Sequence, residues 1–371
     1  MAMSQKQRIL AVARGECLDK LPFGARIDLW YNYNSAHDTL PERYKGRNHV
    51  DIMRDLGAGV QYRYYSVVRE EYQDMEILQK DEPPYKITEF MTPLGSVRKT
   101  LLFTPTEGPW IGYEWEKLFK SEKDYPIIKY VLEHTIPVED LGYYEACQQV
   151  GEDGLVITGV YPWSPVQRVM REIMGYERFF YELADHPKEV EELIEIMKDL
   201  DRKKYEIAVK LDLEIFSVCA NWSDDIHTPV FKKYFIPWFQ EIADLLHAHG
   251  KLAMAHVDGE NKRLIPFFLD THIDVFEAWT PAPMTQVTTA EFRKALGDKA
   301  TIWGGVPATL FEPTYSDEEF DNYILNLFKE IAPGYNFIVG MGDNLPFDGK
   351  IERVRRIVDL IDKHGSLPIS I

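Results

Sequence analysis

The strongest constraint on the fold is an alternation of short apolar runs with long amphipathic segments. Eight runs of seven residues have the character of buried strands: 22–28, 60–66, 155–161, 214–220, 251–257, 273–279, 301–307 and 337–343. Runs that are apolar on both faces are typical of parallel strands covered by helices. Helical patterns lie between the later runs, at 186–211, 228–250 and 316–334. This order predicts an α/β fold, and eight strands predict a closed (β/α)8 TIM barrel.

Residues 67–135 interrupt the alternation. Within them, 85–104 alternates in polarity like a β-hairpin, with Pro93 and Gly95 near its bend. The first sixteen residues have the pattern of a short amphipathic helix. We therefore predict one barrel domain over 1–371, with N-terminal helices and an inserted cap-like segment at about 67–135 that covers the barrel mouth.

Composition narrows the environment and the partners. The net charge of −18 argues against nucleic acid and against an anionic membrane surface, and it suits a docking partner that carries a basic patch. The three cysteines, Cys17, Cys147 and Cys219, form no CxxC pair and no disulfide framework, which indicates a reducing compartment. No run approaches the ~20 apolar residues of a membrane-spanning helix. We expect a cytoplasmic protein.

Metal-binding residue types gather where the predicted strands end. His256 and Asp258 are two positions apart on one strand, so their side chains leave on the same face. Glu277 ends the next strand and Cys219 ends the previous one. Imidazole, thiolate and carboxylate groups are the ligands of zinc, which favours a zinc site held by these four residues. A His or Asp at a strand end also caps loops, and a lone Cys is commonly a small buried hydrophobe.

Other strand ends carry polar and aromatic side chains. In barrels of this kind the site is built from the loops that follow the strands. We predict His256 and Asp343 as catalytic, and the following residues as substrate-binding: Arg26, Asp28, Tyr161, Trp163, Asn221 and Met341. The sequence contains no Walker A motif, no GxGxxG after a strand, no HExxH and no GxSxG, so nucleotide-dependent and serine-hydrolase chemistry lack support.

Several segments resemble the uroporphyrinogen decarboxylase superfamily, and most closely its corrinoid-dependent methyltransferases. The similar segments are RILAVARGECLDKLPFG (8–24), MTPLGSV (91–97), HGKLAMAHVDG (249–259), TIWGGVP (301–307) and FIVGMGDNLP (337–346). The resemblance covers nearly the whole chain. It implies a (β/α)8 barrel with its active site at the carboxyl ends of the strands, and it implies a homodimer.

Departures from the relatives help to choose a branch. The decarboxylases of this superfamily carry an Arg-rich loop after the first strand, whereas Arg26 is the only cation in residues 25–40 here. Thiol-methylating relatives bind zinc through His-x-Cys and a later Cys, and Asp258 and Met341 stand at those Cys positions. The resulting oxygen-rich zinc site suits a Lewis acid acting on an oxygen.

The resemblance therefore implies a methyltransferase of the phenyl methyl ether O-demethylase type. It would move a methyl group from a methoxylated aromatic, or a similar small methyl donor, to cobalamin carried by a partner corrinoid protein. In this reading Tyr161, Trp163 and Met341 line an apolar pocket for the ring, and Arg26 and Asn221 bind its substituents.

Two other readings stay open. One is a metal-free lyase, like the decarboxylases, that acts on a small carboxylate substrate, with Asp28 or Asp343 stabilising a protonated intermediate beside Arg26. The other is a binding barrel without catalysis, which the many polar strand-end residues disfavour.

Overall fold

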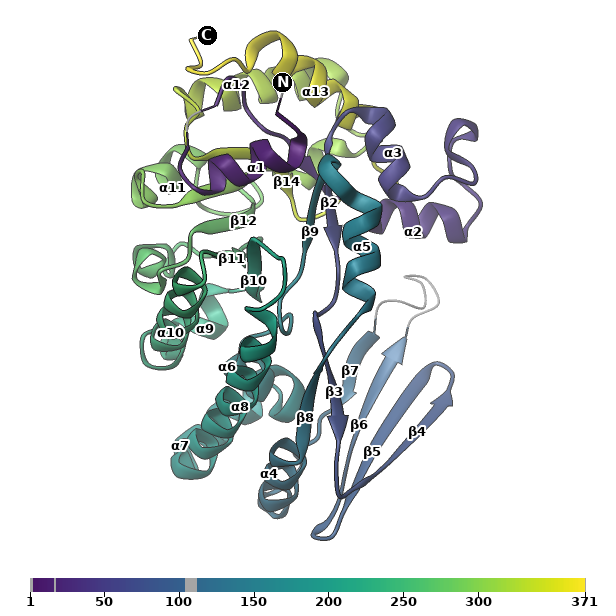
Figure 1. The fold of residues 1–371 in the computed structure, drawn as a ribbon, viewed down its shortest axis with the longest axis vertical. Helices are drawn as coiled ribbons and strands as arrows, with labels where there is room; N and C mark the ends of the chain where they lie inside the picture. The colour runs from purple at the N-terminus through teal and green to yellow at the C-terminus, as the bar shows by residue number, and fades with distance from the viewer. Residues whose placement is uncertain (1–2, 17, 104–111, 371) are drawn as a thin grey trace. The chain divides into compact units, whose positions relative to one another are not determined.

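The computed structural model describes residues 3–16, 18–103 and 112–370. They form two compact units (Figure 1). The first consists of Met1–Tyr65, Leu141–Pro162 and Asp212–Ile371. The second consists of Ser66–Asp140 and Trp163–Leu211. The second unit thus combines the predicted insertion with a stretch that the sequence assigned to the barrel. The single barrel domain with a cap stays a prediction.

Parallel strands organise the first unit. A three-stranded sheet has the order β1 (Gly24–Ala25), β2 (Gly59–Arg63), β9 (Gly154–Ile157). A five-stranded sheet has the order β10 (Ile215–Ala220), β11 (Leu252–His256), β12 (Val275–Trp279), β13 (Thr301–Pro307), β14 (Phe337–Gly342). All neighbours pair in parallel. Each of the eight predicted runs coincides with a strand that lies inside the run or begins one residue before it. This agreement confirms an α/β fold with parallel strands.

Backbone hydrogen bonds also link the two sheets. Ser217 N, within β10, donates to the O atom of Thr158, the residue after β9, at 2.8 Å. Val339 N donates to Pro22 O at 3.0 Å, and Phe23 forms a parallel bridge with Val339. Each sheet therefore has hydrogen-bonded contact with the other at both of its edges.

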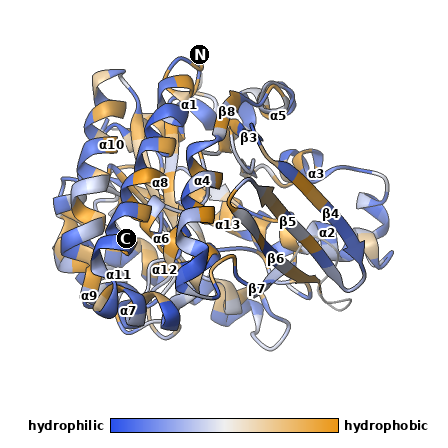
Figure 2. Cartoon of the chain, turned by 90° about the horizontal axis from the view of Figure 1, so that it is seen from below, coloured by the Kyte–Doolittle hydropathy of each residue, from blue (hydrophilic) through white to orange (hydrophobic). Residues whose placement is uncertain are grey.

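Helices accompany these strands in the first unit. They are α1 (Gln5–Ala13), α2 (Asp28–Ala36), α3 (His49–Leu56), α5 (Gly142–Val150), α9 (Asp224–Val230), α10 (Ile236–Ala248), α11 (Thr289–Leu296), α12 (Asp317–Ile331) and α13 (Glu352–His364). Their amphipathic character is visible on α10 (Figure 2). The buried residues of α10 recur with helical spacing: Trp238, Phe239, Ile242, Ala243 and Leu246.

The prediction of one continuous helix over 228–250 is wrong. The segment divides into α9, a π-helical turn at Phe231–Phe235, and α10. Pro229 lies inside α9 and Pro237 lies in the first turn of α10. Neither proline has an N–H to give to a helical hydrogen bond, so the regular ladder cannot run through this segment.

The second unit is a mixture of antiparallel strands and helices. β3 (Val68–Tyr72) pairs with β8 (Thr135–Glu139). A four-stranded sheet follows the order β4 (Glu76–Glu82), β5 (Tyr85–Thr92), β6 (Gly95–Phe103), β7 (Gly112–Glu116). The helices are α4 (Tyr125–Glu133), α6 (Pro165–Arg168), α7 (Tyr176–Asp185) and α8 (Pro187–Ala208), with a π-helical turn at Val169–Met174. β5 and β6 confirm the predicted hairpin; its last residue, 104, lies outside the described residues.

Across the described part of the chain, no helix combines the length and the apolar character needed to cross a membrane.

Trp303 fills the centre of the first unit. It is 1% exposed, and its indole Nε1 donates to Gly24 O at 3.3 Å. A Cβ at Gly24 or at Gly340 would lie 2.4 or 2.6 Å from the Trp303 ring, so glycine at both positions makes room for the indole. The core cluster around it draws on α1 and five strands: Ile9, Leu10, Val12, Ala13, Leu155, Ile157, Ile215, Met254, Val275 and Ile338.

We expect Trp303→Ala to lower the free energy of unfolding by about 3–5 kcal/mol, because it leaves a cavity that surrounding glycines cannot fill. Guanidinium unfolding followed by circular dichroism measures the loss. Trp115→Ala is the matched control, since Trp115 is 65% exposed, and it is expected to change stability by about 0.5 kcal/mol or less. Similar losses from both variants would contradict this description of the core.

Candidate functional site

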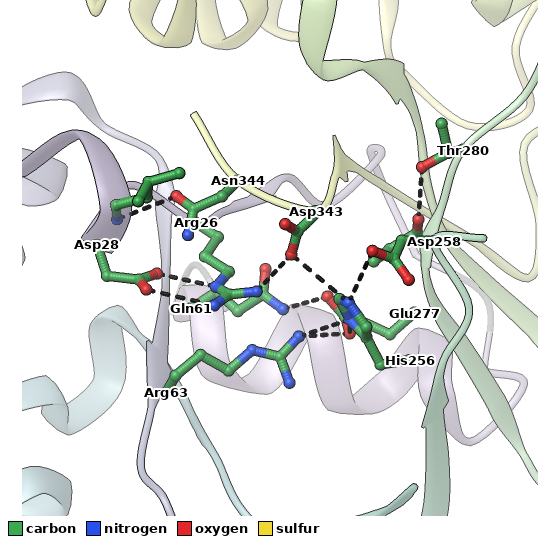
Figure 3. A network of polar contacts seen from close by, with 12 residues as sticks. Arg26, Asp28, Gln61, Arg63, His256, Asp258, Glu277, Thr280, Asp343 and Asn344 are labelled. Atoms are coloured by element: carbon green, nitrogen blue, oxygen red, sulfur yellow. Dashed lines mark hydrogen bonds and ion pairs between the residues drawn. The ribbon is translucent and has the colours of Figure 1, made fainter. Parts of the chain in front are cut away.

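A polar network lies where strands of the first unit end (Figure 3). Its members lie on β2, β11 and β12, in the residues that follow β1, β11 and β14, or at the start of α2: Arg26, Asp28, Gln61, Arg63, His256, Asp258, Glu277 and Asp343. The carboxyl ends of parallel strands lie at the same edge of a sheet, which is where α/β proteins place their sites.

His256 and Glu277 form the buried centre of the network. They are register partners on β11 and β12, so both side chains leave on the same side. His256 Nδ1 lies 2.7 Å from Glu277 Oε2, and their side chains are 6% and 1% exposed. Because a carboxylate only accepts, Nδ1 carries the proton of this bond. Arg63 Nη2 donates to the same Glu277 oxygen at 2.5 Å, and Gln61 Nε2 donates to Oε1 at 2.6 Å.

The other imidazole nitrogen faces two carboxylates. His256 Nε2 lies 3.6 Å from Asp258 Oδ2 and 3.5 Å from Asp343 Oδ1. Ligand atoms of these three residues all lie within 4.8 Å of one another. With the proton on Nδ1, a neutral imidazole offers a lone pair at Nε2, so three acceptors surround one point. Such a cluster needs a cation at its centre, either a proton on Nε2 or a metal ion.

Arg26 holds Asp343 at the edge of this cluster. Its Nη1 donates to Asp343 Oδ1 at 2.5 Å, while Nε and Nη2 donate to the two Asp28 oxygens at 2.9 and 3.3 Å. Asp343 has φ +87°, a region that residues with a Cβ rarely occupy. A Cβ on the preceding Gly342 would lie 2.3 Å from Thr280 Oγ1, so the chain can pass here only with glycine. This constrained turn directs the Asp343 carboxylate toward His256.

Electrostatics make the network strongly ionised. Burial lowers the pKa of His256, but the Glu277 and Asp258 carboxylates outweigh burial and raise it to about 9. Burial likewise raises the pKa of Glu277, but Arg63 and His256 outweigh it and leave that pKa well below its usual range. Burial also raises the pKa of Asp258, but its hydrogen bond with His256 and the charge of that imidazole outweigh burial and lower the pKa. With the imidazole protonated, the network has a formal charge of +3 − 4 = −1. A metal ion that displaces the Nε2 proton would meet two arginines and four carboxylates, a formal charge of +2 − 4 = −2.

The structure separates the four predicted zinc ligands. His256 and Asp258 face the common point. Glu277 lies on the opposite side of the imidazole, bonded to Nδ1. Cys219 is buried in register with Ala255, whereas Ala220 is in register with His256, so strand alternation places the thiol on the other face. Asp343, predicted as catalytic, takes the place of Glu277 and Cys219 beside His256 and Asp258. The ligand set remains a prediction.

The predicted substrate-binding residues are also distributed unequally. Arg26 and Asp28 belong to the network (Figure 3). Asn221 is exposed directly after β10, and its backbone N donates to His256 O at 3.0 Å. Met341 is buried within β14.

The two aromatic candidates lie in different units. Tyr161 belongs to the first, where its ring meets Tyr65 edge-on at 5.7 Å between centroids. Trp163 belongs to the second, where the Arg171 guanidinium lies 4.0 Å from its ring centroid. The substrate roles of all six residues remain predictions.

Sequence reasoning missed Gln61 and Arg63. Both lie on β2, two positions apart, and both reach Glu277. The run VQYRY contains the signal, because polar residues at i and i+2 of an otherwise apolar strand share one face. That spacing is the same one that singled out His256 and Asp258.

The raised pKa of His256 predicts a pH-dependent stability in the metal-free protein. Because the folded-state pKa of about 9 lies above the ordinary 6.5, the protonated pair stabilises the fold fully below pH 6.5 and loses this effect as the pH rises through 9. We expect the difference in unfolding free energy between wild type and His256→Gln to shrink by on the order of 3 kcal/mol from pH 6 to pH 10. Denaturant unfolding at stepped pH measures this difference. The exposed His249, changed to Gln, is the control and should show no such trend; a flat profile for His256→Gln would count against the ion pair.

Comparison with known proteins identifies the family of this chain. Comparison with curated proteins finds no match. Among solved structures, a methyltransferase from Methanosarcina mazei has a similar fold, with a TM-score of 0.62 and 13% sequence identity over 98% of this chain and 99% of that chain. The family model for uroporphyrinogen decarboxylase (URO-D) matches residues 144–364, which is more than half of the sequence. The chain therefore belongs to the uroporphyrinogen decarboxylase family.

Proposed function

We propose that this protein is a methyltransferase that moves a methyl group from a methoxylated aromatic, or a similar small methyl donor, to a corrinoid protein. The observation that carries the proposal is the convergence of His256 Nε2 with the Asp258 and Asp343 carboxylates on one point. The similar fold of the methyltransferase from Methanosarcina mazei also supports a methyl-transfer function. We also infer that the eight parallel strands close into a (β/α)8 barrel, which the hydrogen bonds between the two sheets support.

The donor set fits a divalent metal ion. One imidazole nitrogen and two carboxylate oxygens are ligands that zinc accepts. The formal charge of −2 equals what a divalent cation neutralises, and the three atoms lie close enough together to reach one ion. His256, Asp258 and Asp343 would hold it. When bound, such an ion supplies Lewis acidity toward a substrate oxygen.

The surrounding residues have separate tasks in this proposal. Glu277 keeps the proton of His256 on Nδ1 and so leaves Nε2 available. Arg26 restrains Asp343 through one contact and is occupied by Asp28 through two others. The methyl group leaves the ether oxygen, which keeps the electron pair of the broken C–O bond and later takes a proton from solvent. The new bond to the methyl carbon uses an electron pair of the partner's reduced corrinoid.

The family match itself supports an alternative, a lyase that acts on a small carboxylate without a metal. Two observations favour methyl transfer over it. The donors of Arg26 already engage two carboxylates, and the network carries a formal negative charge that repels an incoming anion. Metal content separates the two proposals, because the lyase needs none.

We expect the purified protein to bind about one equivalent of divalent zinc. His256→Ala and Asp343→Asn should each weaken zinc binding by about 100-fold or more, since the first removes a ligand atom and the second replaces a charged carboxylate with a neutral amide. Elemental analysis gives the stoichiometry and competition with a chelating dye gives the affinity. His249→Ala changes an exposed histidine and should bind zinc like the wild type. Equal zinc binding by all four proteins would remove the metal site from the proposal.

We expect wild-type protein with zinc to release a phenol from a methoxylated aromatic when reduced cobalamin, free or bound to a corrinoid protein, is present. Chromatography of the phenol and the absorbance of methylated cobalamin follow the reaction. His256→Ala should lose at least about 100-fold in rate, and His249→Ala should retain the wild-type rate. Turnover that survives His256→Ala would overturn the mechanism, and decarboxylation of a small acid without metal would favour the alternative.

A further inference from the structure

We propose that Gln61 and Arg63 of β2, acting through Glu277, are positioning residues that fix the His256 imidazole with Nε2 turned toward Asp258 and Asp343. The inference deepens the proposed metal site and rests on it. In this inference Glu277 does not bind the metal but orients the ligand His256. Gln61 and Arg63, which lie on a different strand from every predicted ligand, hold Glu277 in place.

The first argument is the complete occupation of Glu277. Its side chain is 1% exposed, Oε1 accepts from Gln61 at 2.6 Å, and Oε2 accepts from Arg63 at 2.5 Å and from His256 at 2.7 Å. Any rotation that brought this carboxylate to the far side of the imidazole would break all three contacts inside the core. Short, charge-assisted bonds of this kind are the strongest available to a side chain.

The second argument concerns the imidazole. A neutral histidine has two tautomers, and the partner of one nitrogen decides which nitrogen is left with a lone pair. Glu277 holds the proton on Nδ1 of His256, so the lone pair of Nε2 lies toward the carboxylates. Without Glu277 the proton is free to occupy Nε2, and the ring is free to turn about its Cβ–Cγ bond. Both changes reduce the fraction of molecules ready to bind a cation.

The third argument explains Arg63. A buried carboxylate without an opposite charge is costly, and breaking a buried pair is destabilising. Arg63 Nη2 and His256 Nδ1 meet at the same Glu277 oxygen and lie 3.1 Å from each other (Figure 3). Arg63 therefore lets Glu277 remain a buried carboxylate whether the imidazole is charged or neutral. Gln61 fixes the other oxygen and so sets the plane of the carboxylate.

The chain offers a matched control in Glu182. Its carboxylate is also buried, accepts from Tyr125 Oη at 2.8 Å and pairs with Arg178 at 2.5 Å, and it lies in the second unit. A substitution there removes a comparable buried pair without touching the network around His256.

The test compares Glu277→Gln, Gln61→Leu and Glu182→Gln with the wild type. Competition titration with Zn²⁺ gives the dissociation constant, and ¹⁵N NMR of imidazole-labelled protein reports the tautomer of His256. We expect Glu277→Gln to weaken zinc binding 10–100-fold, Gln61→Leu to weaken it less, and Glu182→Gln to leave it unchanged. Recorded on metal-free protein at a pH above 9, where the imidazole is neutral, the ¹⁵N spectrum should show a single Nδ1-protonated form in the wild type and mixed tautomers in Glu277→Gln.

The outcomes separate the roles. Zinc affinity within about twofold of wild type in a folded Glu277→Gln protein overturns the inference. A loss as complete as that of His256→Ala also overturns it, because it makes Glu277 a direct ligand. If Glu277→Gln fails to fold, Gln61→Leu carries the same comparison. A wild type that binds no zinc overturns the inference, whereas zinc binding without demethylation rejects only the proposed reaction.

Discussion

The buried pair of His256 and Glu277 is the interaction on which the rest of the site depends. Two ionisable groups at 6% and 1% exposure are costly unless each has a partner, and here Arg63 and Gln61 complete the hydrogen bonds of the carboxylate. Parallel register between β11 and β12 places the two side chains next to each other, and β2 brings the compensating groups. The polar centre therefore requires at least three strands in their correct positions. It also requires the core of the same unit, in which Gly24 and Gly340 leave room for the Trp303 indole.

Charge ties this centre to the proposed chemistry. Inside the network, Glu277 is compensated by Arg63, whereas Asp28 and Asp343 share Arg26. The uncompensated negative charge therefore gathers where Asp258 and Asp343 face His256 Nε2. A divalent cation matches that charge, and a substrate with many carboxylates does not. Membership in the uroporphyrinogen decarboxylase family is thus compatible with a reaction other than porphyrinogen decarboxylation, because the fold supplies strand ends and the residues there decide the chemistry.

Much of the fold was predictable because continuous apolar runs have few stable alternatives to buried parallel strands. β2 was hardest to recognise, since its polar residues Gln61 and Arg63 weaken the pattern, and those residues turn out to belong to the site. The interruption of the helix after Val230 was missed although Pro229 and Pro237 lie on either side of it. At the site, the strand-end positions of His256 and Asp258 were evident from spacing. The placement of Cys219 was not, because it depends on the register of β10 against β11.

The sequence by itself determined which residue types stand at the ends of the strands, since period and composition fix where an apolar run stops. Only the tertiary structure decided which atoms meet. Asp343 is 87 positions from His256 along the chain (343 − 256), yet it lies near Nε2, while Glu277, only 21 positions away (277 − 256), is bonded to the other ring nitrogen, Nδ1. The physical reason is that hydrogen-bonded register, backbone angles such as the φ of +87° at Asp343, and buried counter-charges set side-chain direction. None of these is a property of a local stretch of sequence.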